Sequence, residues 1–434
     1  MTYDFESDYA VRGKLSAGKQ AEQAGDAVLL GSNGKIPDRF ISGSDFKYSL
    51  SFDAATFATD PTACLAYADD AVGFTKVDGS AETTLKKHAN GSWGDDNPLI
   101  NSMFYATFNG GTIHHILDPE DLTKDINGVD RSSEIQTDNV MLVIPTVYSK
   151  RDANGISISS KPSQGTPYAH TYDGHTYKYL AIGVYEGTIV DGKLKSVSGT
   201  AEPSHDTTRA NFRTAAQANG DGWMLTNWHT RQLIRDLTLM VTKSFDSQRH
   251  VGQGYSTGGS NSAGHRALVP GLGNQLGRYA GNPSGTSDVV KCLIENPWAS
   301  KWEFVDDVLT GYNETDEAWT DIYAGQKLQA TDDLAHMELI GTVVTTNKAG
   351  STNTFATAIQ TDNEAGWGIW DNTSGADNTG LCDKHWSNPS AQRICLCSGS
   401  STYGSAVGVS TLSLNDALSL AGWDIGARPA FVFD

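Results

Sequence analysis

Two cysteines near the end of the chain have a spacing that could support redox or metal chemistry. Cys395 and Cys397 are separated by one residue, and on a β-strand both side chains would lie on the same face of the sheet. Two thiols on one face could bind Cu(I) or form a redox pair. Cysteines of this kind more often act as small hydrophobic core residues, and we favour that interpretation.

His114 and His115, followed by Asp118, are the other residues that suggest a metal site. Adjacent residues on a strand point to opposite faces of the sheet, so the two imidazoles are poorly placed to bind one ion. The sequence contains neither a Gly-Lys-Ser phosphate loop nor a His-Glu-x-x-His metal helix. Its 51 acidic residues are too many and too scattered to nominate a pair for glycoside hydrolysis. The sequence therefore favours a binding protein over an enzyme.

The segment from Leu381 to Tyr403 has the residue types of a recognition surface. Trp386 and Tyr403 offer rigid amphipathic faces. Short polar side chains around them offer directed hydrogen bonds, namely Asp383, His385, Asn388, Gln392 and Arg393. We expect these polar side chains to be exposed and Tyr403 to lie at a loop tip, whereas Trp386 could equally be a core anchor.

Composition limits the environments and partners of the chain. Its 434 residues carry a formal net charge of −19, and an acidic surface repels nucleic acid and anionic membranes. No run approaches the roughly 18 apolar residues of a membrane span, and the N-terminus does not resemble a secretory signal. Five scattered cysteines argue against a disulfide framework. We expect a protein made in the cytoplasm, without nucleic-acid binding or membrane insertion.

The local patterns predict an α+β fold. Runs rich in β-branched and aromatic residues predict strands at 140–144, 177–185, 337–344 and 429–433. Two helices are predicted, one over 206–219 with Asp206 as its N-cap and Gly220 as its terminator, the other over 227–243. The second has one apolar stripe, formed by Leu233, Leu237, Met240 and Val241. Ten glycines between Val251 and Thr286 predict a long irregular loop region.

Two units are expected along the chain. Residues 1–47 read as an attachment or oligomerisation arm, since such a segment is too small to fold alone; a mobile leader is the alternative. Residues 48–434 contain no Pro-rich or Ser-rich hinge, charge block or internal repeat. We therefore treat them as one large domain.

Several stretches between Cys64 and Phe433 together resemble one protein family. They include Tyr67-Ala-Asp-Asp-Ala-Val-Gly-Phe-Thr, Ile116-Leu-Asp-Pro-Glu-Asp-Leu-Thr-Lys, Asn139-Val-Met-Leu-Val-Ile-Pro, Phe212-Arg-Thr-Ala-Ala-Gln-Ala-Asn-Gly-Asp-Gly-Trp, Ile294-Glu-Asn-Pro-Trp-Ala-Ser-Lys-Trp and Ile425-Gly-Ala-Arg-Pro-Ala-Phe. The chain resembles the C-type-lectin-like tail-fibre and baseplate receptor-binding proteins of phages and prophages. This family includes major-tropism-determinant-like variable proteins of diversity-generating retroelements.

The resemblance implies a C-type-lectin-like fold, in which small twisted antiparallel sheets and two helices support long irregular loops. It also implies a homotrimer in the virion tail, held to other tail proteins by the N-terminal arm. The expected function is adhesion to a host-cell surface protein or glycan, through residues 370–403. In the family, glycines are commoner where Asp383 and Lys384 stand here, so the loop path need not be shared.

Two alternatives come with the resemblance. The chain could be a structural virion decoration or baseplate component that uses the fold for assembly only. It could also be an oxidase similar to formylglycine-generating enzymes, which share the fold and use cysteines near the C-terminus. Cys395 and Cys397 would then be the reactive pair.

One short sequence string suggests a calcium site. Residues 367–374 are similar to the string that supports calcium in sugar-binding C-type lectins, and they place Trp370, Asp371 and Asn372 among the candidate ligand-binding residues. Carboxylate and amide oxygens suit Ca²⁺. The Glu-Pro-Asn motif that accompanies this string in those lectins is absent. We therefore expect no required cofactor, with calcium at Asp371 and Asn372 as the alternative.

Overall fold

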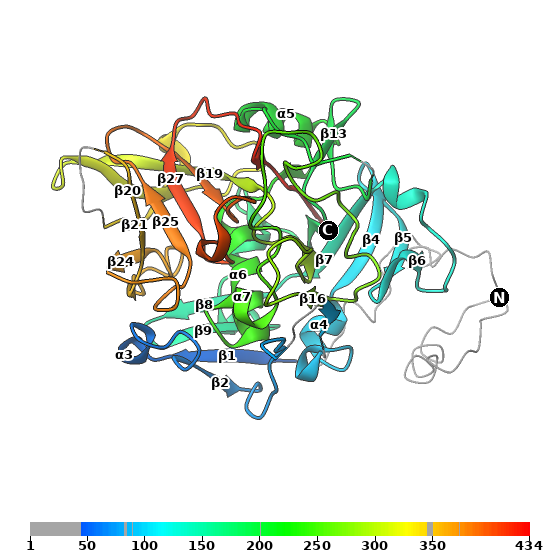
Figure 1. The fold of residues 1–434 in the computed structure, drawn as a ribbon, viewed down its shortest axis with the longest axis horizontal. Coiled ribbons are helices and arrows are strands. Elements are labelled where there is room, and N and C mark those ends of the chain that lie inside the picture. Colours follow the sequence, from blue (N-terminus) through cyan, green and yellow to red (C-terminus); the bar gives the residue numbers. More distant parts are fainter. Residues whose placement is uncertain (1–44, 82–84, 89, 200, 345–349, 373) are drawn as a thin grey trace.

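The computed structural model describes residues 45–81, 85–88, 90–199, 201–344, 350–372 and 374–434 (Figure 1). It consists mostly of small antiparallel sheets with few helices, as the sequence predicted. The expected arm lies outside the described residues except for its last three. Of these, Phe46 already stacks its ring on Tyr48 at 5.1 Å, so the folded part has begun by this residue.

A seven-stranded, fully antiparallel sheet occupies one side of the molecule (Figure 1). The predicted strands at 140–144, 177–185 and 429–433 are confirmed in this sheet, where alternate residues face two apolar layers. The predicted strand at 337–344 is confirmed over 338–342 in another sheet. In spatial order the strands are β15 (Trp223–Leu225), β29 (Pro429–Phe433), β12 (Tyr179–Gly183), β7 (Asn139–Pro145), β4 (Phe104–Asn109), β5 (Thr112–Asp118) and β6 (Asp121–Asp125).

An eight-stranded mixed sheet occupies the other side (Figure 1). In spatial order, seven of its strands are β21 (Glu338–Thr342), β20 (Ala318–Ala324), β19 (Trp302–Asn313), β26 (Ile394–Cys397), β27 (Leu412–Asp416), β25 (Lys384–Ser387) and β22 (Thr352–Phe355). The eighth, β28 (Ile425–Gly426), pairs with β19. Strand β25 pairs with β22 in antiparallel and with β27 in parallel orientation. This sheet carries most of the predicted recognition segment.

Smaller sheets complete the β-structure. One four-stranded sheet has the order β2 (Leu65–Asp69), β1 (Lys47–Phe52), β9 (Gly155–Ser159) and β8 (Tyr148–Asp152). The other has the order β18 (Ile294–Glu295), β17 (Lys291–Cys292), β16 (Tyr279–Gly281) and β3 (Lys86–Lys87). Three hairpins pair β10 (Thr171–Tyr172) with β11 (His175–Thr176), β13 (Thr188–Val190) with β14 (Lys193–Lys195), and β23 (Ala358–Ile359) with β24 (Trp370–Asn372).

The first long helix begins later than predicted. Helix α5 spans Arg209–Gln217, and the hydroxyl of its N-cap Thr208 accepts a hydrogen bond from the Asn211 amide. Asp206 has a φ of 52°, whereas an N-cap residue needs an extended backbone. The predicted cap was therefore wrong. Gly220, the predicted terminator, lies just beyond the helix with a φ of 131°.

The second long helix confirms its prediction and lies at the centre of the molecule (Figure 1). Helix α6 spans Trp228–Thr242; Asn227 caps its start, and Lys243 ends it in the left-handed conformation. The predicted apolar stripe is buried in the core. Every residue of α6 is buried, including its polar ones, so this helix carries charged groups into the interior.

The remaining helices are short. They are α3 (Ala54–Phe57), α4 (Pro98–Ser102) and α7 (Ser247–His250), with 3₁₀ turns η2 (Gly91–Trp93), η3 (Glu134–Gln136), η4 (Pro162–Gln164), η5 (Tyr168–His170), η6 (Leu334–His336) and η7 (Gly404–Ala406). Between Val251 and Thr286 the chain is irregular except for β16, which confirms the predicted loop region. No helix in the described ranges has the length and apolar character needed to cross a bilayer.

Candidate functional site

Strand β25 divides the predicted recognition residues between two faces of one sheet. Successive side chains of a strand point in opposite directions, and along β25 the side chains alternate between half-buried and buried. Lys384 and Trp386 lie on the outer face. His385 and Ser387 lie on the inner face, against the main core.

The outer face carries an aromatic cluster, which we define as Trp302, Trp386 and Tyr403. Trp302 begins β19, Trp386 lies on β25, and Tyr403 lies in the loop between β26 and β27. The ring centroids are 5.2 Å apart for Trp302 and Trp386, 5.5 Å for Trp302 and Tyr403, and 5.1 Å for Trp386 and Tyr403. The interplanar angles are 71–87°; this edge-to-face geometry is favourable for aromatic pairs.

Exposure within the aromatic cluster increases from base to tip. Trp302 is buried, Trp386 is half-buried, and Tyr403 is 37% exposed. The expectation that Tyr403 lies at an exposed loop position is therefore confirmed. Trp386 combines both roles that the sequence left open, since it packs against the core below and remains partly open to solvent.

Two carboxyl groups flank the aromatic cluster. Asp416 accepts a hydrogen bond from the Ser413 hydroxyl at 3.0 Å, and Asp424 accepts one from the Ser400 hydroxyl at 3.3 Å. Burial raises the pKa of both carboxyls. Burial also raises the pKa of Tyr403, and the nearby charge of Asp424 adds to that rise. A ligand on Tyr403 would thus meet a phenol donor between two acidic acceptors.

A cation lies beside the aromatic cluster. The Lys384 ammonium is 5.7 Å from the ring centre of Trp386 and 5.8 Å from that of Phe355, which is within cation–π range. Sequence reasoning named neither Lys384 nor the two carboxyls as site residues. Lys384 could have been predicted as a site residue, because it lies two residues from Trp386 on one strand and therefore shares its face. Asp416 and Asp424 are brought in by β27 and β28, which no short motif marks.

The turn after β25 holds Asn388 and Arg393 together. The Arg393 guanidinium donates to the Asn388 carbonyl at 3.1 Å and to the Ser390 hydroxyl at 3.0 Å. Asn388 accepts from Ser390 and donates to Ser351. Arg393 also lowers the pKa of Asp416 electrostatically, against the dominant effect of burial. Asn388, Gln392 and Arg393, which the sequence predicted to be exposed, are half-buried.

Asp383 and His385 are corrections to the sequence analysis, which expected them to be exposed. Both are buried. One Asp383 oxygen accepts the Ser410 amide at 2.7 Å, and burial raises the pKa of this carboxyl well above its ordinary value. Burial lowers the pKa of His385 to about 3. These residues support the recognition segment from below and do not reach its surface.

Trp370 is also a correction, because it lies in the core. Its indole donates to the Val344 carbonyl at 3.0 Å, and its ring stacks on His385 with a centroid distance of 4.7 Å and an interplanar angle of 9°. Asp371 follows it on β24 and is exposed. Asn372 ends β24, and its side chain lies outside the described residues. Hence Asp371 stays a candidate contact, whereas Trp370 does not.

The two cysteines that could form a reactive pair are core residues. Cys395 and Cys397 lie on β26 and are buried among apolar side chains. Burial raises the pKa of each thiol, which keeps both protonated and reduces their nucleophilicity. The structure thus places them as the small core hydrophobes that the sequence favoured.

One group of side chains has the donor set of a divalent cation. His114, Glu134 and Asp138 have ligand atoms within 4.8 Å of one another, the only such group that the described residues form. Each already has a partner within the protein: Asp138 pairs with His114 at 2.7 Å, and Glu134 pairs with His115 at 2.9 Å. These ion pairs account for the group without an ion. Asp371 does not belong to it.

A Gly-x-Ser-x-Gly string that sequence reasoning missed runs from Gly254 to Gly258. In hydrolases this string forms a sharp turn between a strand and a helix that exposes the serine. Here it lies in the irregular region, where Ser256 is buried and its amide donates to the Thr286 carbonyl. The structural context of a nucleophile is therefore absent from this segment.

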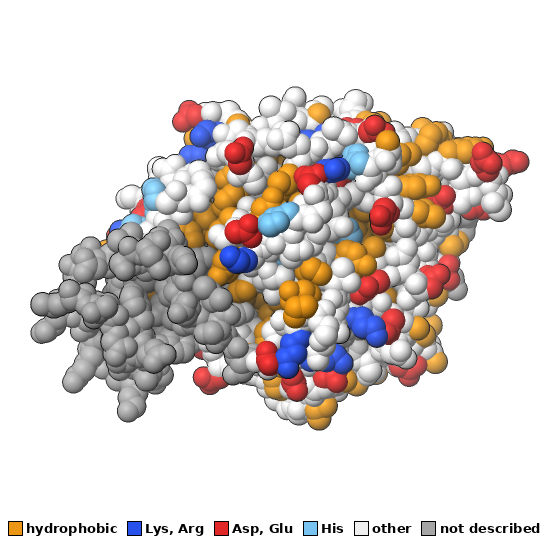
Figure 2. Space-filling model, turned by 180° about the vertical axis from the view of Figure 1, so that it is seen from behind, with side chains coloured by type: hydrophobic (Ala, Val, Ile, Leu, Met, Phe, Trp, Pro, Cys, Tyr) orange, Lys and Arg blue, Asp and Glu red, His pale blue; other side chains and the backbone are white. Residues whose placement is uncertain are grey.

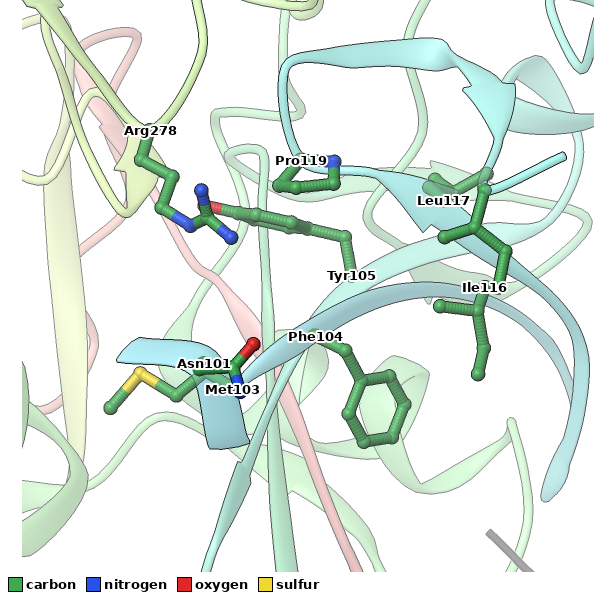
Figure 3. Close-up of a pocket in the computed structure, with 9 residues that line it drawn as sticks. Asn101, Met103, Phe104, Tyr105, Ile116, Leu117, Pro119 and Arg278 are labelled. Atoms are coloured by element: carbon green, nitrogen blue, oxygen red, sulfur yellow. The ribbon is translucent and has the colours of Figure 1, made fainter. Parts of the chain in front are cut away.

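A small cavity beside β4 and β5 is lined mainly by apolar side chains and by Arg278 (Figure 3). The Arg278 guanidinium lies next to the Tyr105 ring in this view and forms an ion pair with Asp95 at 2.8 Å. The Tyr105 hydroxyl donates to the Leu293 carbonyl. The Tyr105 hydroxyl and one Arg278 nitrogen are thus engaged within the protein, whereas Nη1 of Arg278 has no hydrogen-bond partner among the described residues.

Acidic and hydrophobic groups are spread over the surface rather than gathered. On the face seen in Figure 2, hydrophobic side chains form several separate groups among polar atoms and scattered acidic residues. Tyr312 belongs to another exposed aromatic pair, with its ring 5.6 Å from that of Trp319. Exposed aromatic area is therefore not unique to the aromatic cluster. The charged groups beside the aromatic cluster distinguish it.

Comparison with known proteins adds little beyond this geometry. No protein-family model and no curated protein matches the chain. Solved structures that are similar to it include two variants of one protein. The Major Tropism Determinant U1 variant has a TM-score of 0.25 and 12% sequence identity, covering 76% of this chain and 72% of that chain. The Major Tropism Determinant P3c variant has a TM-score of 0.26 and 12% identity, covering 76% and 71%.

Proposed function

We propose that this chain is a receptor-binding protein of a phage or prophage tail, which attaches to a host-cell surface protein or glycan through the aromatic cluster. Residues 48–434 would form a C-type-lectin-like domain. The family resemblance of the sequence supports this proposal, as do the two long helices α5 and α6, the small sheets and the long irregular loops.

The geometry of the aromatic cluster carries the proposal. Binding hot spots are enriched in tryptophan and tyrosine that sit on a packed base and are surrounded by polar groups. Tyr403 meets this description, because Trp302 and Trp386 fix its ring while its edge stays open. Asp416, Asp424 and Lys384 supply the surrounding polar and charged groups.

Multivalency would provide the strength of attachment. We propose that the N-terminal arm joins three copies and anchors them to other tail proteins in the virion. Linked copies turn weak single-site contacts into strong overall binding by raising the effective concentration of the second and third sites. Light scattering of the full-length chain tests this, because the proposal predicts three times the mass of one 46.5 kDa chain.

The proposed function is tested by binding of the labelled protein to a panel of intact bacterial cells and to an array of bacterial surface glycans. We expect a positive signal for the wild-type chain and its loss in Tyr403→Ala. Tyr312→Ala is the matched control, since Tyr312 is 49% exposed and also forms an edge-to-face aromatic pair.

Two outcomes would contradict the proposal. One is the absence of binding to any cell or glycan in the panel. The other is equal loss of binding in Tyr403→Ala and Tyr312→Ala, because that result would locate recognition outside the aromatic cluster.

A further inference from the structure

A cavity of about 20 Å³ lies between helix α6 and the residues 409–412 that lead into strand β27. Trp228, Arg231, Gln232 and Arg235 line it from α6, at the i, i+3, i+4 and i+7 spacing of one helical face. Val409, Ser410 and Leu412 line it from the opposite side. The polar side chains that face this cavity are all more than nine-tenths buried.

Several donors at this cavity have no hydrogen-bond partner within the described part of the chain. They are Nε and Nη1 of Arg231, Nε of Arg235 and the hydroxyl of Ser410. The other nitrogens of the two arginines are used: Arg231 donates to the Pro297 carbonyl at 2.7 Å, and Arg235 donates to the Trp367 carbonyl at 2.8 Å. Buried polar groups are almost always satisfied, so these donors indicate an occupant that accepts hydrogen bonds.

The charges around the cavity do not balance. Arg151, Arg231 and Arg235 bring three guanidinium groups into the interior, but Asp236 is shared by Arg151 at 2.6 Å and Arg235 at 3.5 Å. Asp383 faces Arg231, but burial favours the neutral form of its carboxyl. Burial, together with the nearby charges of Arg151 and Arg231, lowers the pKa of Arg235 to about 10, against the opposing effect of the Asp236 carboxylate. Among the described residues, these three guanidinium groups thus share one ion-paired carboxylate, that of Asp236.

We propose that this cavity binds one halide ion, chloride under physiological conditions, between Arg231, Arg235 and Ser410. A cavity of this volume has room for one or two water-sized particles, which is enough for a monatomic anion. A water molecule would satisfy the donors but would leave the charge unbalanced. The Gln232 side chain also lines the cavity, and its Nε2 donates to the Trp367 carbonyl at 3.4 Å.

The site lies beneath the predicted recognition segment, which runs from Leu381 to Tyr403. Leu412 begins β27 and pairs with His385 of β25, while Arg231 also donates to the Val409 carbonyl at 3.5 Å. The ion would therefore join α6 to the segment that leads from Tyr403 into β27. Its expected effect is on the stability of this part of the fold, independent of any ligand on the outer face.

Thermal unfolding of the full-length chain tests the proposal. Tm is measured while sodium gluconate is replaced by sodium chloride or bromide at constant ionic strength. Because an ion that binds only the folded state stabilises it in proportion to occupancy, we expect a saturable rise in Tm with either halide. Sodium sulfate at matched ionic strength should raise Tm without saturation, through its exclusion from the protein surface.

Variants locate the effect. Arg231→Met should abolish the halide-dependent rise, and Ser410→Ala should move it to higher halide concentration. Arg249→Met is the matched control, since it removes the same charge from an exposed position of the neighbouring helix α7 and should retain the full rise. If Arg231→Met does not fold, the position of bromide in crystals of the wild-type chain decides, with a peak expected between Arg231 and Arg235.

Three results would overturn the proposal. Chloride and gluconate curves that coincide would mean that the cavity holds water only. A full halide effect in Arg231→Met would place the ion elsewhere, as would bromide bound only at the surface.

Discussion

The two faces of strand β25 differ in burial, although its four side chains alternate between them. On the outer face, Trp386 and Lys384 belong to a half-open surface with Tyr403 at its tip. On the inner face, His385 stacks on Trp370 inside the core, and neither of its ring nitrogens has a hydrogen-bond partner within the described residues. The same short segment thus supplies both a half-open surface and the core beneath it.

This difference teaches that residue type alone does not assign a role in such a segment. A tryptophan, a histidine and an aspartate can each serve recognition or support, and the direction of the side chain decides between them. Substitutions on the inner face should therefore change stability, and substitutions on the outer face should change binding.

The largest effect is expected from Trp370→Ala. Truncating a buried tryptophan leaves a cavity, and such changes cost about 3–5 kcal/mol of unfolding free energy. The urea midpoint of unfolding measures this cost. Tyr312→Ala, at an exposed position, should cost less than about 1 kcal/mol. A similarly small cost for Trp370→Ala would mean that Trp370 belongs to the surface after all.

An intermediate effect is expected from each buried imidazole when the protein is acidified. Burial lowers the pKa of His170 to about 4, and of His229 and His385 to about 3. Because the folded state holds these imidazoles neutral, their contribution to stability is full above pH 6.5 and is lost as pH falls toward the folded pKa. Between pH 6.5 and 5 each imidazole should cost about 2 kcal/mol.

His385→Phe isolates one of these contributions. Phenylalanine can keep the stacking on Trp370, so the variant should fold and lose about 2 kcal/mol less than the wild type between pH 6.5 and 5. Unfolding free energies at the two pH values measure the difference. Carboxyls with raised pKa, such as Asp383, change stability in the opposite direction, but they act equally in both chains. Identical pH profiles would contradict the burial of a neutral imidazole.

The smallest effect is expected from Lys384→Met on the outer face. Methionine keeps most of the apolar stem, so the variant loses chiefly the cation–π contact with Trp386 and Phe355, about 0.5–1 kcal/mol at a partly exposed site. The shift of the thermal midpoint measures it. A loss as large as that of Trp370→Ala would show that the two faces do not differ as described.

The sequence predicted the parts of the fold that local patterns determine. Helix α6 was predicted from its apolar stripe over 227–243, and the observed helix lies within these bounds. Helix α5 was found with the wrong cap, because Asp206 and Thr208 are both good cap residues and only the backbone conformation separates them.

The candidate site was predicted only in part. Tyr403 was recognised from its small, polar neighbours, which favour a loop. Asp383 and His385 were misplaced because burial of a polar side chain depends on elements distant in sequence, such as Ser410 and Trp370. Asp416 and Asp424 were missed for the same reason, since the pairing of β27 with β26 and of β28 with β19 brings them to the aromatic cluster.

The central claim is that recognition belongs to the outer face of β25 and not to the inner face. The most direct test is the affinity of Tyr403→Ala and His385→Phe for one ligand identified in the cell or glycan panel. We predict that Tyr403→Ala weakens binding at least about tenfold, which corresponds to about 1.4 kcal/mol, whereas His385→Phe binds as the wild type does. Unchanged binding in Tyr403→Ala together with lost binding in a folded His385→Phe would contradict the account.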